Sequence, residues 1–350
     1  MSNATRWYTT REAVKLAVGI AGSELDALID SYIESASADI ERLLEGRHFI
    51  PVTATKTYRW PQYRGDPLVL RFPDQDLIAV TTLQAKAQDA SPTTIASTDY
   101  FLEPQDQGPP YSRIEIDLSS SAAFESGDTP QRSIAVTGRW GYREDTRAAG
   151  ATAEALDSSE TGVDVTDASL IGVGDTLLID SEAMFVTAKA ALTIGTTMND
   201  TLTADLDDVT VTLADGTAAK VGEVLLFDSE RMLVESITGN NLTVKRAHDG
   251  SVLAAHSTGI TVYAFRTLTV VRGVNGTTAA SHLTAATISK YAPPADVADY
   301  CRAYAIGHLK QGQSGWTGQI SGGEAAVNVR MVDLFYLGKA LQEKYGKVTL

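Results

Sequence analysis

Two pairs of carboxylates, Asp180-x-Glu182 and Asp228-x-Glu230, are the residues best placed for chemistry. With a spacing of two, both members of a pair lie on one face of a β-strand. Paired carboxylates can bind calcium or serve as acid and base. However, the pairs sit in two copies of one repeated sequence, and no cluster of further donor residues accompanies either pair. We therefore favour a structural motif over a metal site or a catalytic pair.

Two histidines, His256 and His282, occupy matching positions in a second repeated sequence. A zinc site needs more ligands than the spacing around them offers, so a hydrogen-bonded histidine that closes a hairpin is the favoured interpretation. The sequence also has no phosphate-loop, dinucleotide-binding, nucleophile-elbow or zinc-protease motif. We expect no catalytic residue, no metal and no cofactor, and hence a protein that is not an enzyme.

Composition sets further limits. The chain has 350 residues, 43% of them hydrophobic, and a formal net charge of −15, which is the wrong sign for binding a phosphate backbone. Its one cysteine, Cys301, excludes an internal disulfide and favours a buried small side chain in a helix. No apolar run approaches the roughly 18 residues of a membrane span, and the first residues lack a signal-peptide pattern. We therefore expect a soluble protein of cytosolic origin with no membrane partner.

One long amphipathic helix organises the expected fold. Within Gly22–Phe49, apolar residues recur every three or four positions, which predicts a helix of about 22 residues and roughly 33 Å. Ser23 is its expected N-cap, and Gly46 its expected left-handed end. A possible capping box, Thr9-Thr10-Arg11-Glu12, opens a shorter helix before it.

Short alternating runs and two later helices complete the pattern. Residues 150–162 are small and polar and predict a linker, and prolines 293 and 294 begin a helix that ends near Gly312. A last helix is expected to have Leu334, Leu341 and Tyr345 on one side. The predicted strands are 55–60, 67–72, 77–84, 99–103, 113–117 and 133–140.

The middle of the chain contains an internal duplication. Residues 173–186 match 221–234 at nine of fourteen positions, and 242–257 match 268–283 at seven of sixteen. The order is therefore A-A-B-B, which predicts one β unit (about 206–264) nested inside another (163–190 with 267–291). Four hairpins of one sandwich, lying side by side, are the alternative. Both interpretations are all-β.

Taken together, the segments on either side of this region resemble the head–tail connector (adaptor) family of tailed bacteriophages. The resemblance covers 1–147 and 291–350. It rests on the order of several short motifs: Tyr8-Thr9-Thr10-Arg11-Glu12, Ala36-Ser37, Arg47-x-Phe49, LVLRFP with LIAVTTLQ, Asp99-Tyr100, Val136-x-Gly138-x-Trp140-Gly141-Tyr142 and Pro293-Pro294-Ala295-Asp296-Val297. In the family the last two motifs nearly adjoin, whereas here the duplicated region separates them. That region is similar to hairpin units of phage structural proteins, through Arg272-Gly273-x-x-Gly276-Thr277-x-Ala279-x-x-His282.

The resemblance implies an α+β fold: a helical adaptor core with a small β-sheet or hairpin, interrupted by an all-β insertion at 148–290. It further implies a structural virion protein, made in the host cytoplasm and placed at the head–tail interface. Copies of it would form a dodecameric ring on the portal, extend the DNA channel and contact tail or stopper proteins. DNA would pass without specific binding, and the insertion would be placed to meet the major capsid protein or the tail.

Two sets of residues are candidates for these contacts. An acidic stripe on the long helix either faces the channel or a neighbouring subunit, or is simply a solvated face: Asp26, Asp30, Glu34, Glu41 and Glu45. A glycine-rich loop and the chain end are candidates for docking on the portal, with a linker and a tail as the alternative: Trp316, Tyr345, Val348 and Leu350.

A tail-associated protein that binds or hydrolyses carbohydrate, or binds a receptor, through the β region is the alternative function. Sugar sites favour exposed Trp and Tyr, but residues 148–290 contain only Tyr263 and no Trp. The sequence therefore favours the structural role.

Overall fold

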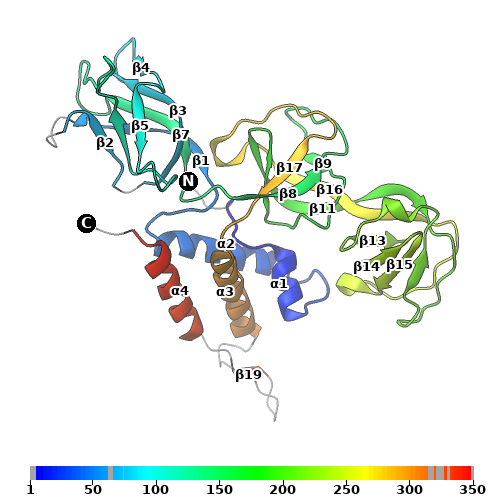
Figure 1. Ribbon diagram of the computed structural model, residues 1–350. Coiled ribbons are helices and arrows are strands. Elements are labelled where there is room, and N and C mark those ends of the chain that lie inside the picture. The colour runs from blue at the N-terminus through cyan, green and yellow to red at the C-terminus, as the bar shows by residue number, and fades with distance from the viewer. Residues whose placement is uncertain are drawn as a thin grey trace.

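A computed structural model describes residues 5–61, 66–73, 75–313, 319–320, 327–328 and 332–347. Four helices form one part, a small β domain lies beside them, and a larger β region extends to the other side (Figure 1). The expected α+β class is confirmed. None of the described helices is long and apolar enough to cross a membrane.

The helical part is built on α2, against which the other three helices pack. Its buried face carries Ile29, Ile33 and Ile40. In Figure 1, α1, α3 and α4 form a row beside α2, with α3 in the middle. The helices are α1 (Arg11–Val18), α2 (Asp26–Leu43), α3 (Ala295–Gln313) and α4 (Val332–Tyr345).

The first two helices begin differently from the sequence prediction, whereas the predicted left-handed Gly46 follows α2. The N-cap of α2 is Leu25, which makes no side-chain cap, and Ser23 offers only its backbone carbonyl, 3.1 Å from the amide of Asp26. In α1, the side chain of Thr10 caps the amide of Ala13. The carboxylate of Glu12 accepts instead from the amide of Val173, at 2.9 Å. The predicted Ser23 cap is therefore wrong, because α2 begins two residues later. The predicted capping box is also wrong, because the carboxylate of Glu12 binds the β region and not the start of its own helix.

The small β domain contains a four-stranded sheet, in the order β1-β7-β3-β4, and a three-stranded sheet, β2-β6-β5. Both contribute to one core that includes the buried Leu77, Ile114 and Trp140. Six strands lie where the alternation predicted them, and β4 is additional. Their bounds are β1 (Val52–Tyr58), β2 (Val69–Arg71), β3 (Leu77–Ala85), β4 (Thr93–Ile95), β5 (Tyr100–Glu103), β6 (Arg113–Ile116) and β7 (Ile134–Trp140).

The larger β region is one ten-stranded sheet with two separate cores. We call the residues around the first core the proximal module (146–190 with 267–291), and those around the second the distal module (196–264). The long strands β11 and β16 pair with each other and run through both modules (Figure 1). The strands are β8 (Thr146–Ala151), β9 (Gly162–Asp164), β10 (Thr176–Ile179), β11 (Glu182–Thr197), β12 (Thr210–Thr212), β13 (Val224–Phe227), β14 (Glu230–Thr238), β15 (Asn241–Lys245), β16 (Thr261–Val271) and β17 (Thr287–Tyr291).

The predicted linker at 150–162 is instead part of the proximal module. Ala151 ends β8, which pairs with β17. Thr152 and Leu156 are buried, and Leu156 forms a bridge with His282. Small polar composition was misleading here, because this segment supplies backbone groups to a buried network described below. Whether 148–290 folds as an independent insertion stays a prediction.

Candidate functional site

The first carboxylate pair lies in a buried network of the proximal module. Glu182, at the start of β11, accepts two hydrogen bonds from the guanidinium of Arg272, at 2.7 and 2.8 Å. The amides of Gly273 and Ala280 donate to the same carboxylate at 3.0 and 2.9 Å. His282 links the pair, with Nε2 2.9 Å from Glu182 and Nδ1 2.7 Å from Asp180.

The distal module repeats this arrangement residue for residue. Arg246 donates to Glu230 at 2.8 and 2.9 Å. The amides of Ala247 and Ala254 donate to Glu230 at 3.0 and 3.1 Å. His256 again lies between the acids, 2.8 Å from Glu230 and 3.0 Å from Asp228. The duplicated sequence thus builds the same buried network twice.

The electrostatics of both networks keep the buried glutamate ionised near neutral pH. Burial alone would raise the pKa of Glu182. The hydrogen bonds from Arg272, from two amides and from His282 outweigh it and lower that pKa to about 2. The pKa of Glu230 is likewise lowered to about 2 by the corresponding donors, against the effect of burial. These glutamates are therefore poor acids and poor bases near neutral pH.

The arginines close loops as well as neutralising charge. Arg272 donates to the carbonyls of Asp157 and Glu160 at 2.9 and 2.8 Å, and Arg246 donates to those of Thr203 and Asp208 at 3.1 and 3.0 Å. The donors and acceptors of each network are thus used within the module. Among the described residues, no group of three or more His, Cys, Asp or Glu could hold a metal ion. The arrangement holds loops in place.

Sequence reasoning identified the acids and the histidines but not the part played by the two arginines. Arg246 and Arg272 occupy matching positions in the second repeat. A buried carboxylate requires a cation as its partner. The signal that could have identified the two arginines was therefore their matching position in the second repeated sequence, next to the matching histidines.

The predicted acidic stripe on α2 is divided by the structure. Arg11 and Lys15 bind Asp26 at 3.4 and 3.0 Å, and Arg11 also pairs with Asp30. Arg6 binds Glu41, which is buried, at 2.9 Å. Three of the five carboxylates are therefore neutralised by cations from the first helix and the segment before it.

The other two carboxylates of the stripe have a different environment. Glu34 is half-buried and Glu45 is exposed, and neither side chain forms an ion pair with a described residue. They are the members of the stripe that remain available for a channel-facing or subunit-contact role, which stays a prediction.

The predicted docking residues also differ among themselves. Tyr345 is only 3% exposed, with its ring 5.3 Å from that of Phe49 and 5.7 Å from that of Tyr142. Its side chain therefore packs in the core and is not presented to a partner. Trp316, Val348 and Leu350 lie outside the described residues, so their docking role stays a prediction.

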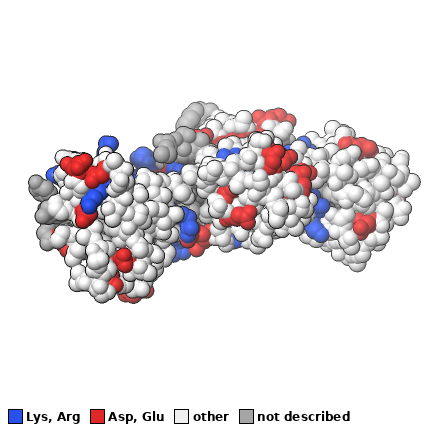
Figure 2. All heavy atoms as spheres, turned by 90° about the horizontal axis from the view of Figure 1, so that it is seen from above, with Lys and Arg blue, Asp and Glu red and all other residues white. Residues whose placement is uncertain are grey.

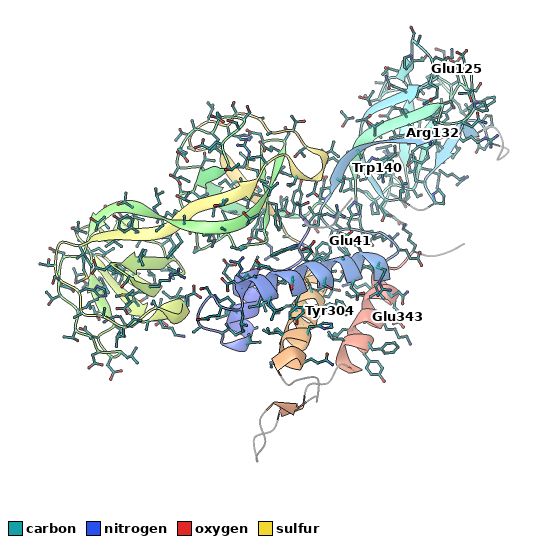
Figure 3. The ribbon with its side chains drawn as sticks, turned by 180° about the vertical axis from the view of Figure 1, so that it is seen from behind. Glu41, Glu125, Arg132, Trp140, Tyr304 and Glu343 are labelled. Carbon is teal, nitrogen blue, oxygen red and sulfur yellow. The ribbon has the colours of Figure 1, made fainter. Side chains whose placement is uncertain are left out.

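An exposed aromatic surface, which sequence reasoning missed, lies at the start of α4. Phe335 is 69% exposed and Tyr336 63%, and Leu337 follows them at 45%. A groove of about 350 Å³ adjoins Phe335, with Leu43 and Tyr300 on its other side. We call Phe335, Tyr336 and Leu337 the α4 surface; Figure 3 shows α4 at the edge of the row of helices, with Tyr304 on neighbouring α3. Their successive positions, which cannot all face inward on a helix, were the available signal.

Some of the residues that carry the family resemblance meet in the helical core, whereas those of LVLRFP, LIAVTTLQ and Asp99-Tyr100 contribute to the separate core of the small β domain. The amide of Tyr8 donates to the hydroxyl of Ser37 at 3.2 Å, and its phenol donates to Glu41 at 2.9 Å. The same phenol oxygen accepts from the amide of Phe49 at 3.3 Å. The ring of Phe49 packs on Tyr8 and Tyr142 at 5.8 Å each. We call Tyr8, Ser37, Glu41, Phe49 and Tyr142 the Tyr8–Phe49 hub; Figure 3 labels Glu41, which lies on α2.

Charge is distributed without a large patch of one sign on the face seen in Figure 2, where basic and acidic side chains lie interspersed. Basic side chains of the described residues are also paired with acids, as Arg139 is with Glu144 and Lys290 with Asp175, both at 2.8 Å. This face therefore offers no broad basic surface to nucleic acid.

Comparisons with known proteins give little. No family model matches the chain, and no curated protein matches it. Among solved structures it has a likeness to a chain of the "Neck of empty GTA particle computed with C6 symmetry", with 18% identity and a TM-score of 0.26, over 41% of this chain and 68% of that chain. A TM-score this low does not establish a common fold.

Proposed function

We propose that this protein is a structural component of a tailed phage or phage-like virion, and that it acts as a head-to-tail adaptor. In this role, copies of the chain form a ring on the portal, extend the DNA channel and connect the capsid to the tail. Its action is assembly through packing and shape rather than catalysis.

The observation that carries this proposal is the Tyr8–Phe49 hub. The motifs that resemble the adaptor family are far apart in the sequence, yet Tyr8, Ser37, Phe49 and Tyr142 contact one another in a chain of hydrogen bonds and ring contacts. The proline-initiated helix of the resemblance reaches the same core through Val297. Motifs from five separate segments therefore contribute to one core, which supports the proposal, while the remaining motifs lie in the small β domain.

We assign the α4 surface to contacts between copies of the chain. Exposed aromatic side chains grouped on one surface are typical of protein interfaces. Next to Phe335 and Tyr336, Lys339 is 62% exposed, so a polar rim adjoins the apolar centre. A neighbouring copy in the ring would cover these side chains and exclude water from the adjoining groove.

The carbohydrate-binding alternative gains no support from the β region. Tyr263 is 38% exposed, and the described residues that line the groove between the two modules include no aromatic side chain. The exposed aromatic residues of the α4 surface belong to the helical part, where the ring proposal uses them.

The decisive experiment is to mix the purified protein with the portal ring of its own virus and image the product by cryo-electron microscopy. A symmetric second ring beneath the portal is expected, and it would show which partners the proximal and distal modules face. If the chain leaves the portal bare, the adaptor proposal is wrong. A glycan array probed with the full chain would then test the alternative.

A further inference from the structure

The repeat places an equivalent turn in each module. One of these turns contacts strand β1, and the other contacts the turn between α1 and α2. In the proximal module the turn is Val274–Gly276, and in the distal module it is His248–Gly250. A methyl group on Gly276 would lie 2.0 Å from the carbonyl oxygen of Thr53, and one on Gly250 would lie 2.7 Å from the Cα of Gly22. Both turns therefore approach another backbone so closely that a side chain does not fit.

The proximal contact is broad and apolar. Phe185 and Val274 belong to the buried core of the helices, and the ring of Phe185 meets that of Trp7 edge-on at 5.2 Å. A backbone hydrogen bond from Arg11 to Val173, at 3.0 Å, adds to it. Burial of apolar surface is insensitive to salt screening, so this module is firmly fixed.

The distal contact is small and ionic. Lys15 of α1 donates to Asp249 at 2.6 Å and also pairs with Asp26 at 3.0 Å. Asp249 pairs with Arg231 of its own module through its other oxygen. The core of the distal module contains no residue of the helices. What holds this module against the α1–α2 turn is therefore a set of charges around the turn glycine, in which the side chain of Asp249 is 24% exposed and that of Lys15 is 10% exposed.

The connection between the modules allows bending. The pairing of β11 with β16 is interrupted at three points between Val186 and Thr197, each with a shift of register. A groove of about 360 Å³ beside this connection is lined by both modules, including Val165 and Ala218. The amide of Ala168 donates to Glu223 across the groove at 3.1 Å, and Arg266 of β16 holds the same carboxylate at 2.7 Å, so these contacts mark the point about which bending occurs. Figures 1 and 3 show this narrow ribbon between two compact bodies.

We propose that Lys15 and Asp249 form a releasable latch, which holds the distal module against the α1–α2 turn and whose opening lets that module move about the β11–β16 ribbon. The turn of the proximal module forms a permanent contact, whereas the same turn in the distal module forms one that competing charges can open. This inference does not depend on the adaptor proposal, because it concerns the isolated chain.

The test is hydrogen–deuterium exchange of the full chain, read in peptides that cover 20–26 and 248–251. The variants are Asp249→Asn, which tolerates the left-handed backbone of this turn (φ 51°), and Lys15→Met. Asp207→Asn is the matched control, because it removes an acid from the same module away from the latch. Each latch variant should exchange about tenfold faster at both turns, which corresponds to roughly 1.4 kcal/mol. The control should exchange like the wild type.

Three further readouts keep the proposal falsifiable. Exchange in β14 and β15 must stay slow, which shows that the module itself is folded. The effect of the double variant should be smaller than the sum of the two single effects, because the shared Lys15–Asp249 pair is lost only once. Raising salt to about 1 M should speed exchange in the wild type but not in the latch variants, and the radius of gyration from X-ray scattering should rise with it. If both latch variants keep wild-type exchange and scattering, the latch does not exist.

Discussion

The guanidinium of Arg272 and the carboxylate of Glu182 are joined by two hydrogen bonds of 2.7 and 2.8 Å in the interior of the proximal module. Arg246 and Glu230 are joined in the same way in the distal module. Both glutamates have fully buried side chains. Each module is therefore held by one charged pair that also fixes its loops.

Removing the acid from such a pair should be costly. For Glu230→Gln we expect a loss of about 3–5 kcal/mol in the free energy of unfolding of the distal module, because Arg246 is left buried without its counter-charge. Asp228→Asn is the matched control, since Asp228 touches the same histidine but its side chain is 60% exposed. Denaturant unfolding, followed by hydrogen exchange of the β14 amides, measures the free energy of unfolding of both variants. Equal stabilities for the two variants would contradict this role of Glu230.

The same glutamates predict how stability depends on pH. The folded pKa of Glu182 and of Glu230 is about 2, depressed below the ordinary value of 4.5. Their contribution to stability should therefore be complete above about pH 4.5 and be lost as the pH falls toward 2. Thermal melting of the β region at a series of pH values checks this. In Glu230→Gln, the part of the decline that belongs to the distal module should be absent.

The hydroxyl of Tyr8 should stabilise the helical part. In Tyr8→Phe, the buried amide of Phe49 loses its acceptor and Glu41 loses a donor, which should cost about 1–3 kcal/mol. Tyr336→Phe makes the same chemical change at an exposed position and should cost nothing measurable. Urea unfolding followed by helical circular dichroism compares them. If Tyr8→Phe is as stable as Tyr336→Phe, the hydrogen bonds of the Tyr8 hydroxyl do not stabilise the protein.

Deletion of 148–290, with a short Gly/Ser link, should leave a helical and β core that folds but is less stable. The loss of stability is expected because Phe185 and Val274 leave the buried core and expose Trp7. Circular dichroism shows whether the product is folded. Its melting temperature, expected to be lower than that of the full chain, measures the loss of stability. An unfolded product would show that the predicted boundaries do not separate two folding units.

The α4 surface should matter for assembly and not for folding. A double variant, Phe335→Ser with Tyr336→Ser, should unfold within about 0.5 kcal/mol of the wild type, because both side chains are exposed already. It should fail to form a ring on the portal. Leu118→Ser, at an 81% exposed position of the small β domain, is the control and should assemble normally. Normal rings from the double variant would assign the α4 surface to another partner.

Sequence reasoning succeeded where local pattern decides structure. Alternation located most strands of the small β domain, and prolines located the start of α3. It failed where a distant segment decides. The acids of α2 were read as one stripe because helical periodicity cannot show that Arg6, Arg11 and Lys15 return to meet them. The polar segment 150–162 was read as a linker because only the fold shows that its carbonyls bind Arg272.

The distal module has only two covalent connections to the rest of the chain, and they run side by side as β11 and β16. Tension applied along this ribbon would be shared by two backbones in parallel, so the hydrogen bonds between the strands would carry little of the load. Once the latch between Lys15 and Asp249 is open, sideways force meets the ladder with its irregular points and the contacts of Glu223. The distal module is therefore built like a tether, strong when pulled and compliant when bent.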